Sequence, residues 1–139
     1  MKWYGITGSW RETTESVESD VRLAVRNIIQ RGDGIVTGGA PNVDYFASSE
    51  ALKHNPTGEY IKVFIPTNLW HYTVKARERE AAGRVSSAQT AAIIETLTTL
   101  KALGSLIEES TNTELSTRTY FSNNTRIVAA SDEMLGFQV

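Results

Sequence analysis

The sequence predicts an α/β domain of three layers, with a mostly parallel sheet of about four strands flanked by helices. Short β-branched or apolar runs alternate with longer runs of helical spacing over the first 65 residues, in the order strand, helix, strand, helix, strand. The connections between them are short, and this pattern is typical of a parallel sheet with right-handed crossovers. A chain of 139 residues is expected to form one such domain, covering residues 1–139.

The first strand and the first helix are predicted by local signals. Residues 2–7 form the strand, and Thr13 or Thr14 can cap the helix that follows. Gly32 is a natural residue just beyond the C-terminus of this helix. Apolar residues recur along the helix with helical spacing, which predicts a buried stripe of Val17, Val21, Ala24, Val25 and Ile28.

The second strand, residues 34–37, runs into two glycines and the start of a helix. Gly38 and Gly39 allow either a sharp turn or the close approach of a ligand to the backbone. Pro41 suits the first helical position, and Asn42 is a second candidate for the N-cap. Free N–H groups at the start of a helix suit an anion. The motif by itself therefore leaves two interpretations open, an anion site or a tight strand-to-helix connection.

The rest of the chain continues the alternation. After a third strand at residues 60–65, we expect a loop at 67–72 and a helix at 74–82. The mixed charges of that helix favour a solvated surface over a binding patch. Two more helices and a terminal strand complete the prediction: a long helix from Ser86 or Ser87 to about Glu109 with Ile107 in its buried stripe, a helix at 118–130 and a strand at 133–139.

The composition restricts the classes of function. Apolar residues make up 40% and charged residues 22% of the chain, which is typical of a globular protein. The net charge of −2 does not favour a broad nucleic-acid-binding face. There is no cysteine, and His54 and His71 lie in unrelated loops, so neither a metal nor a cofactor is predicted. With no apolar run of about 18 residues and no signal-peptide pattern, we expect a cytoplasmic protein without a membrane partner.

A second glycine turn follows the first strand and contains Gly8, Ser9, Trp10 and Arg11. A hydroxyl, an indole and a guanidinium thus gather at another strand-to-helix junction. Arg11 can make a bidentate contact with a phosphate or a carboxylate. The alternative is that Arg11 is a solvated loop residue and that Trp10 covers the core.

Three segments resemble a known superfamily. Gly5-Ile6-Thr7-Gly8-Ser9 is similar to its first strand and turn, and Thr37-Gly38-Gly39-Ala40-Pro41-Asn42-Val43-Asp44 is similar to its Gly-Gly-Ala-x-Gly-(Val/Ile)-Asp signature. The segment from Asn124 through Ser131-Asp132 to Gly136-Phe137 resembles its Arg-Asn-x-x-Ile-Val-x-x-(Ala/Ser)-Asp segment. The superfamily is the Rossmann-like group, with SLOG-type domains, that contains DNA-processing protein A (also called Smf) and the Lonely Guy phosphoribohydrolases.

The resemblance implies a nucleotide-related ligand at the C-terminal ends of the strands, in agreement with the general rule for open α/β sheets. The glycine-turn amides would meet a phosphate, and Asp44 would hold the loop or a ribose hydroxyl. The ligand-binding residues that we expect are Gly8, Ser9, Trp10, Arg11, Thr37, Gly38, Gly39, Ala40, Asn42, Asp44, Arg118 and Asn124.

Two departures from the superfamily pattern bear on its chemistry. Asn123 stands where the superfamily has an arginine, and Arg118 or Arg126 is expected to replace that charge because both lie on the same helix. The sequence also ends before the usual phosphate loop, Pro-Gly-Gly-x-Gly-Thr, with the helix and strand that follow it and the catalytic glutamate to which it leads in the phosphoribohydrolases.

Four functional hypotheses follow, and they belong to different classes. The first is binding of a nucleotide-related ligand with no reaction assigned. The second is hydrolysis of the N-glycosidic bond of a nucleoside monophosphate, for which Asp44, Glu78 and Glu80 are the candidate carboxylates. The third is DNA binding as in DNA-processing protein A, against which the acidic balance argues. The fourth is a fragment or a homo-oligomer, because a sheet order of 3-2-1-4 would leave the apolar terminal strand at an edge.

Overall fold

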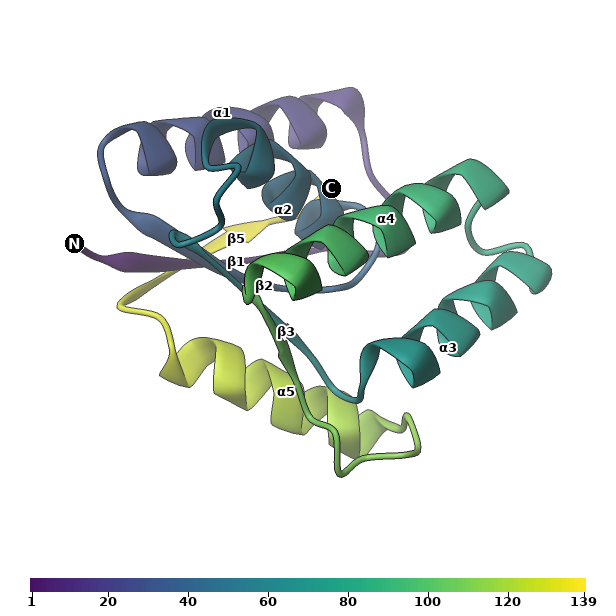
Figure 1. Ribbon diagram of the computed structural model, residues 1–139. Helices are drawn as coiled ribbons and strands as arrows, with labels where there is room; N and C mark the ends of the chain where they lie inside the picture. Colours follow the sequence, from purple (N-terminus) through teal and green to yellow (C-terminus); the bar gives the residue numbers. More distant parts are fainter.

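The computed structural model describes all of residues 1–139 and contains one five-stranded sheet. Every strand pair is parallel, and the order is β4-β3-β2-β1-β5 (Figure 1). The predicted α/β class is confirmed, with five strands in place of about four. The strands are β1 (Trp3–Gly8), β2 (Gly34–Gly38), β3 (Ile61–Ile65), β4 (Leu106–Glu108) and β5 (Glu133–Phe137).

Five helices connect the strands, and they are α1 (Glu15–Gln30), α2 (Val43–His54), α3 (Leu69–Ala81), α4 (Ser87–Leu103) and α5 (Thr117–Ala129). Most of them begin at a side-chain cap. Thr14 Oγ1 accepts a hydrogen bond from Val17 N at 3.1 Å, and Ser86 and Ser116 each form a reciprocal capping box with the residue three positions later. These caps satisfy backbone donors that the first helical turn leaves free, which is why short sequence signals locate the helix starts.

Two predicted boundaries are wrong. The long helix ends at Leu103 because Gly104 adopts a left-handed conformation with φ of 80°, so Ile107 lies in the short strand β4 and not on a helical stripe. The segment expected to be a loop at 67–72 contains the start of α3. Asn68 caps that helix, since its side chain accepts from His71 N at 2.9 Å.

Helices cover both faces of the sheet (Figure 1). Helices α1, α2 and α4 share the larger core cluster with one face of the strands, including Val21, Ile35 and Leu97. Helix α5 covers the other face, where Ile127 packs with Val36 and Phe64. The strands of the centre are therefore buried on both sides, which explains their continuous apolar sequence. No helix of the structure is long and apolar enough to cross a lipid bilayer.

Candidate functional site

The two glycine turns lie side by side at the carboxyl edge of the sheet, because β1 and β2 are adjacent and parallel. Asn42, at the start of α2, donates a hydrogen bond from Nδ2 to the carbonyl oxygen of Trp10 at 2.5 Å. Thr37 Oγ1, near the end of β2, donates to the carbonyl oxygen of Ile6 in β1 at 2.9 Å. The backbone after β1 and the backbone after β2 are thus fixed to one another.

An internal carboxylate occupies the glycine turn after β2. Asp44 Oδ2 accepts from the backbone N–H of Ala40 at 3.1 Å, and Asp44 Oδ1 lies 3.1 Å from Thr37 Oγ1. A Cβ atom on Gly38 would stand 2.7 Å from Asp44 Oδ2, so glycine at this position admits the carboxylate. The amide of Ala40, expected to meet a phosphate, already has an anionic partner from the same chain. Asp44 therefore stabilises the glycine turn after β2 with its own carboxylate.

The other glycines of the two turns are also closely packed by the protein itself. A Cβ atom on Gly39 would stand 2.8 Å from Ile65 Cγ2, and one on Gly8 would collide with the carbonyl oxygen of Phe137. The amide of Ser9 donates to that same carbonyl at 3.3 Å. The space beside Gly39 and Ala40 has no room for a water molecule. These positions give the edge its shape, and the room for a ligand lies elsewhere along it.

Burial raises the pKa of the Asp44 carboxyl to about 6, because the loss of solvation outweighs the hydrogen bonds from Ala40 and Thr37. A carboxyl with this pKa can exchange a proton near neutral pH, which is the property of a general acid or base. Its two oxygens, however, are both engaged by the turn. The geometry supports a structural role for this group.

A cavity of about 700 Å³ opens at the same edge of the sheet. Its lining residues come from the turn after β1, from the second half of α3 with the residues that follow it, and from the start of α5 with the two residues before it. The lining residues are Trp10, Arg11, Lys75, Glu78, Arg79, Ala82, Arg84, Leu115, Ser116, Thr117 and Tyr120. Of the residues predicted from sequence, the cavity gathers Trp10, Arg11 and the carboxylate candidate Glu78.

The cavity is strongly cationic although the whole chain is slightly acidic. Four side chains that line it carry a positive charge, Arg11, Lys75, Arg79 and Arg84, and one carries a negative charge, Glu78. Glu78 Oε2 lies 3.4 Å from Lys75 Nζ and is 61% exposed, so this pair is solvated and weak. Like charges held around one concave surface raise the local positive potential and favour an anion.

Arg79 is the least satisfied of the four cations. Its Nε and Nη2 atoms are buried and have no hydrogen-bond partner. The guanidinium stacks on the ring of Tyr72 at 5.5 Å from the ring centroid, and Tyr72 is itself only 2% exposed. Burial raises the pKa of the Tyr72 hydroxyl, so the ring that supports Arg79 stays neutral. Buried donors without acceptors are costly, which makes Arg79 the lining residue with the greatest unmet need for an acceptor.

Arg11 is held by an aromatic ring from its own turn. Its guanidinium lies 4.8 Å from the ring centroid of Trp10, the residue whose carbonyl oxygen is bound by Asn42. Asn42, whose backbone is strained with φ of 67°, thereby fixes the backbone of the turn that carries both side chains. On the opposite wall, Tyr120 of α5 contributes a second aromatic ring.

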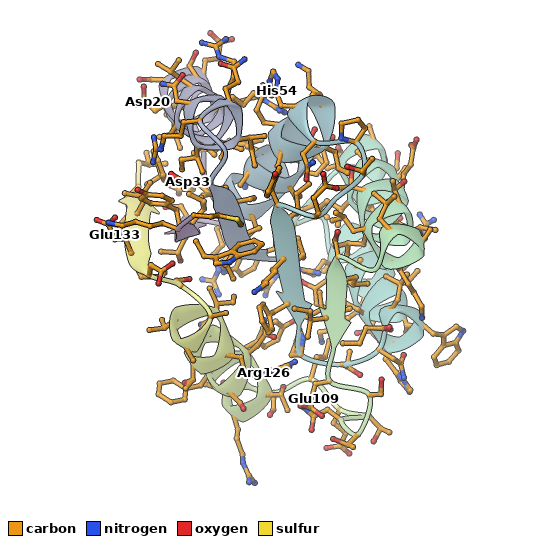
Figure 2. All side chains as sticks on the ribbon, turned by 60° about the vertical axis from the view of Figure 1, so that its left-hand side comes forward. Asp20, Asp33, His54, Glu109, Arg126 and Glu133 are labelled. Atoms are coloured by element: carbon orange, nitrogen blue, oxygen red, sulfur yellow. The ribbon has the colours of Figure 1, made fainter.

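The residues that the sequence assigned to α5 do not join this cavity. Arg118 lines a separate polar cavity of about 430 Å³ together with Thr111 and Ser122. Asn124 is exposed and lines neither of the two cavities. Arg126 stacks over Phe64 and approaches Glu109 Oε2 at 3.7 Å (Figure 2). Neither Arg118 nor Arg126 lines the cavity that contains Arg11, so neither of them replaces the charge of the superfamily arginine there.

Asn123, at the position of that arginine, has a structural contact. Its Nδ2 donates to the carbonyl oxygen of Phe64 at 3.0 Å, and the residue is 5% exposed. An arginine there would be directed into the packing of α5 against β3. The charge of the site comes instead from α3, on the other side of the cavity.

Sequence reasoning missed Lys75, Arg79 and Arg84 because it treated the α3 segment as a solvated helix. A signal was present in the spacing. Lys75 and Arg77 each have a glutamate three residues later, and both pairs form in the structure. Arg79 has Lys75 four residues before it and Gly83 four residues after it, with no acid at either neighbouring turn. Arg79 is thus a cation without an acidic partner on its own helix.

No known protein-family model matches the chain, and no curated protein matches it either. The resemblance to the DNA-processing and Lonely Guy group rests on the quoted motifs alone. The function is therefore argued from the geometry and the charge of the cavity.

Proposed function

We propose that this protein binds a nucleotide-related small molecule at the carboxyl edge of the sheet, with a phosphate group beside Arg79. The observation that carries the proposal is that Arg79 lines a large cationic cavity and that its Nε and Nη2 atoms are buried without hydrogen-bond partners. A planar guanidinium with two free N–H groups matches the bidentate geometry of a phosphate.

The size and the aromatic content of the cavity support the nucleoside part of the proposal. A volume of about 700 Å³ lies within the usual range of small-molecule sites. Trp10 and Tyr120 offer ring surfaces to a base, and stacking of a base on an aromatic side chain contributes about 1–3 kcal/mol. Ligands of open parallel sheets bind outside the carboxyl ends of the strands, which is where this cavity opens.

Calorimetric titration with AMP tests the proposal, using the wild type and two variants of α3. Arg79→Met removes the charge and keeps an unbranched apolar side chain against Tyr72. Arg77→Met is the matched control, because Arg77 is exposed on the same helix and does not line the cavity. We expect wild type and Arg77→Met to bind alike and Arg79→Met to bind at least tenfold more weakly. Absence of binding of both AMP and ADP to the wild type at millimolar concentrations would overturn the proposal.

The hydrolase hypothesis finds less support in the geometry. Asp44 is engaged by Ala40 and Thr37, and Glu78 is an exposed partner of Lys75. General acid–base work needs a carboxyl that can reach the glycosidic bond. Release of adenine from AMP by the wild type, abolished in Asp44→Asn, would establish the reaction; we expect no release.

DNA binding is also less favoured. The four cations surround a cavity, whereas a duplex or a single strand needs cationic groups along an extended surface. We expect no salt-dependent binding of single-stranded DNA at low salt. A shift that weakens with added salt would reverse this order of preference.

The proposal includes self-association in the cytoplasm. β5 forms one edge of the sheet, and its residues are exposed or half-buried. An edge strand presents free backbone N–H and C=O groups that can pair with another chain. We expect light scattering to give at least twice the mass of one chain at high protein concentration, and a monomer mass would contradict this part.

A further inference from the structure

We infer that the ligand carries two linked phosphate groups, so that the site prefers a nucleoside diphosphate to a nucleoside monophosphate. This inference rests on the proposed function and specifies the ligand of the same cavity. It is drawn from the number of cations, from the segments that supply them and from the way in which two of them are held.

The charge of the cavity exceeds that of one phosphate. Four cationic side chains face one carboxylate, an excess of three positive charges. A single phosphate monoester carries about 1.5 to 2 negative charges at neutral pH, and a second linked phosphate raises this to about three. A diphosphate therefore matches the excess, while a monophosphate leaves at least one cation of the cavity without a counter-charge.

The cations form two groups from distant parts of the chain. Arg11 follows β1, whereas Lys75 and Arg79 lie on α3 and Arg84 follows that helix. The two groups meet only because the folded chain closes the cavity between them. A ligand with one phosphate for each group would bridge the two walls.

The two guanidiniums are fixed by different rings. Arg11 stacks on Trp10 at 4.8 Å, and Arg79 stacks on Tyr72 at 5.5 Å. Each arginine can then serve a phosphate of its own without giving up its ring. A cation that already contacts a ring loses less rotamer freedom on binding than a free one, and this gain is smaller for the exposed Arg11 than for Arg79.

Competition and direct titration with four probes test the inference in buffer without divalent cations. The probes are AMP, ADP, inorganic phosphate and pyrophosphate. We expect ADP to bind at least tenfold more tightly than AMP, and pyrophosphate to displace ADP at concentrations at which phosphate does not. Raising the salt concentration should weaken the binding of ADP more steeply than the binding of AMP, because ADP neutralises more charge when it binds.

Two variants test whether the second phosphate is bound by the wall that carries Arg11. Arg11→Gln, at an exposed turn position, should reduce the preference for ADP over AMP to less than threefold. Arg77→Met, outside the cavity, should keep the full preference, and unchanged far-ultraviolet circular dichroism would show that both variants are folded.

The outcomes distinguish the two levels of the argument. Equal affinity for AMP and ADP would overturn the diphosphate inference and leave the proposed function intact. A preference for ADP that Arg11→Gln does not reduce would also overturn it, since the second phosphate would then lie away from Arg11. Failure of all four probes to bind would overturn the proposed function itself.

Discussion

The side chain of Asn42 binds the carbonyl oxygen of Trp10 at 2.5 Å and joins the start of α2 to the turn after β1. Asn42 stands at the N-cap position of α2, yet its side chain makes no capping bond within that helix. The residue is the only non-glycine with a positive φ, 67°, and it is 7% exposed. The fold thus tolerates an unfavourable backbone conformation at Asn42, the residue that joins the ends of β1 and β2.

Substitution of Asn42 should separate the hydrogen bond from the backbone strain. Asn42→Ala loses the bond and keeps a Cβ at a positive φ, so we expect a loss of about 2 kcal/mol in the free energy of unfolding. Asn42→Gly loses the same bond but relaxes the backbone, and its loss should be below about 1 kcal/mol. Urea denaturation measures both, with exposed Asn124→Ala as a neutral control. Equal losses in the two Asn42 variants would contradict a contribution from strain.

Arg79→Met should stabilise the free protein while it weakens ligand binding. The substitution removes a half-buried cation whose buried Nε and Nη2 atoms have no acceptor, and the lost stacking on Tyr72 offsets part of the gain. We expect a net gain of about 1 kcal/mol, or roughly 3–4 °C in the melting temperature for a domain of this size. The measurement is thermal unfolding in a buffer free of phosphate.

The control for this stability prediction is Arg77→Met. Arg77 Nη1 lies 3.7 Å from Glu80 Oε2 in an exposed pair, so its loss should change the melting temperature by little. A melting temperature of Arg79→Met below that of the wild type would show that Arg79 is satisfied in the free protein. The anion-binding argument would then lose its main support.

Asp44 should make the protein less stable as the pH rises through the range from about 4 to 6. Its pKa is raised from 3.8 to about 6, so the folded state binds the proton more tightly than the unfolded state does. The stability of the folded state then falls between the two pKa values, by about 3 kcal/mol for a shift of this size. The destabilisation by Asp44 is complete at pH values above the pKa of the folded state and absent below the pKa of the unfolded state.

Asp44→Asn should remove this component of the pH dependence. The amide can accept from Ala40 N with Oδ1 and donate to Thr37 Oγ1 with Nδ2, so both contacts of the carboxylate have a replacement. The measured quantity is the difference in unfolding free energy between wild type and variant at a series of pH values. A difference that stays constant across the range from about pH 4 to 7 would refute the raised pKa.

Glu50 should be required for the contact between α1 and α2. Its side chain is 7% exposed and lies near Arg22 at 3.3 Å, Lys53 at 3.7 Å and His54 at 2.6 Å. Burial raises the pKa of Glu50, but the hydrogen bond to His54 and the charges of Lys53 and Arg22 outweigh it, so that the pKa lies below its ordinary value. The stabilisation is present above the pKa of the unfolded state and is lost as the pH falls through the folded one.

Glu50→Gln should reduce the free energy of unfolding by about 2 kcal/mol at neutral pH. This is less than for a fully buried pair, because the side chains of Arg22 and His54 keep 26% and 24% of their exposure. Glu18→Gln is the matched control, since Glu18 pairs with the same arginine but is 41% exposed. We expect a change below about 0.5 kcal/mol there, and equal losses in the two variants would show that burial of Glu50 has no effect.

The elements that the sequence predicted well are those with local signals. Thr14 and Ser86 cap the helices at which they were expected, and the glycine turn after β2 lies at the predicted strand-to-helix junction. The strand β4 was missed because its three residues continue the apolar spacing of α4, and only the left-handed Gly104 interrupts it. The start of α3 was missed because the capping residue, Asn68, precedes a segment without apolar periodicity.

The candidate site was predicted only in part. Two of the expected ligand-binding residues, Trp10 and Arg11, line the cavity, while the amide of Ala40 is bound by Asp44 and Asn124 points to solvent. Arg79 was overlooked because the spacing shows only that its charge has no acidic partner on the helix, and not whether the side chain faces water or a buried ring.

The sequence by itself determined the alternation of strands and helices, the helix ends and the glycine turns, since capping, periodicity and steric freedom act between residues a few positions apart. Only the tertiary structure decided that Arg11 and Arg79 share a cavity, that Asn42 fixes Trp10 and that Asp44 fills the glycine turn. Packing between distant segments sets which polar groups lose contact with water, and that loss leaves Arg79 without an acceptor.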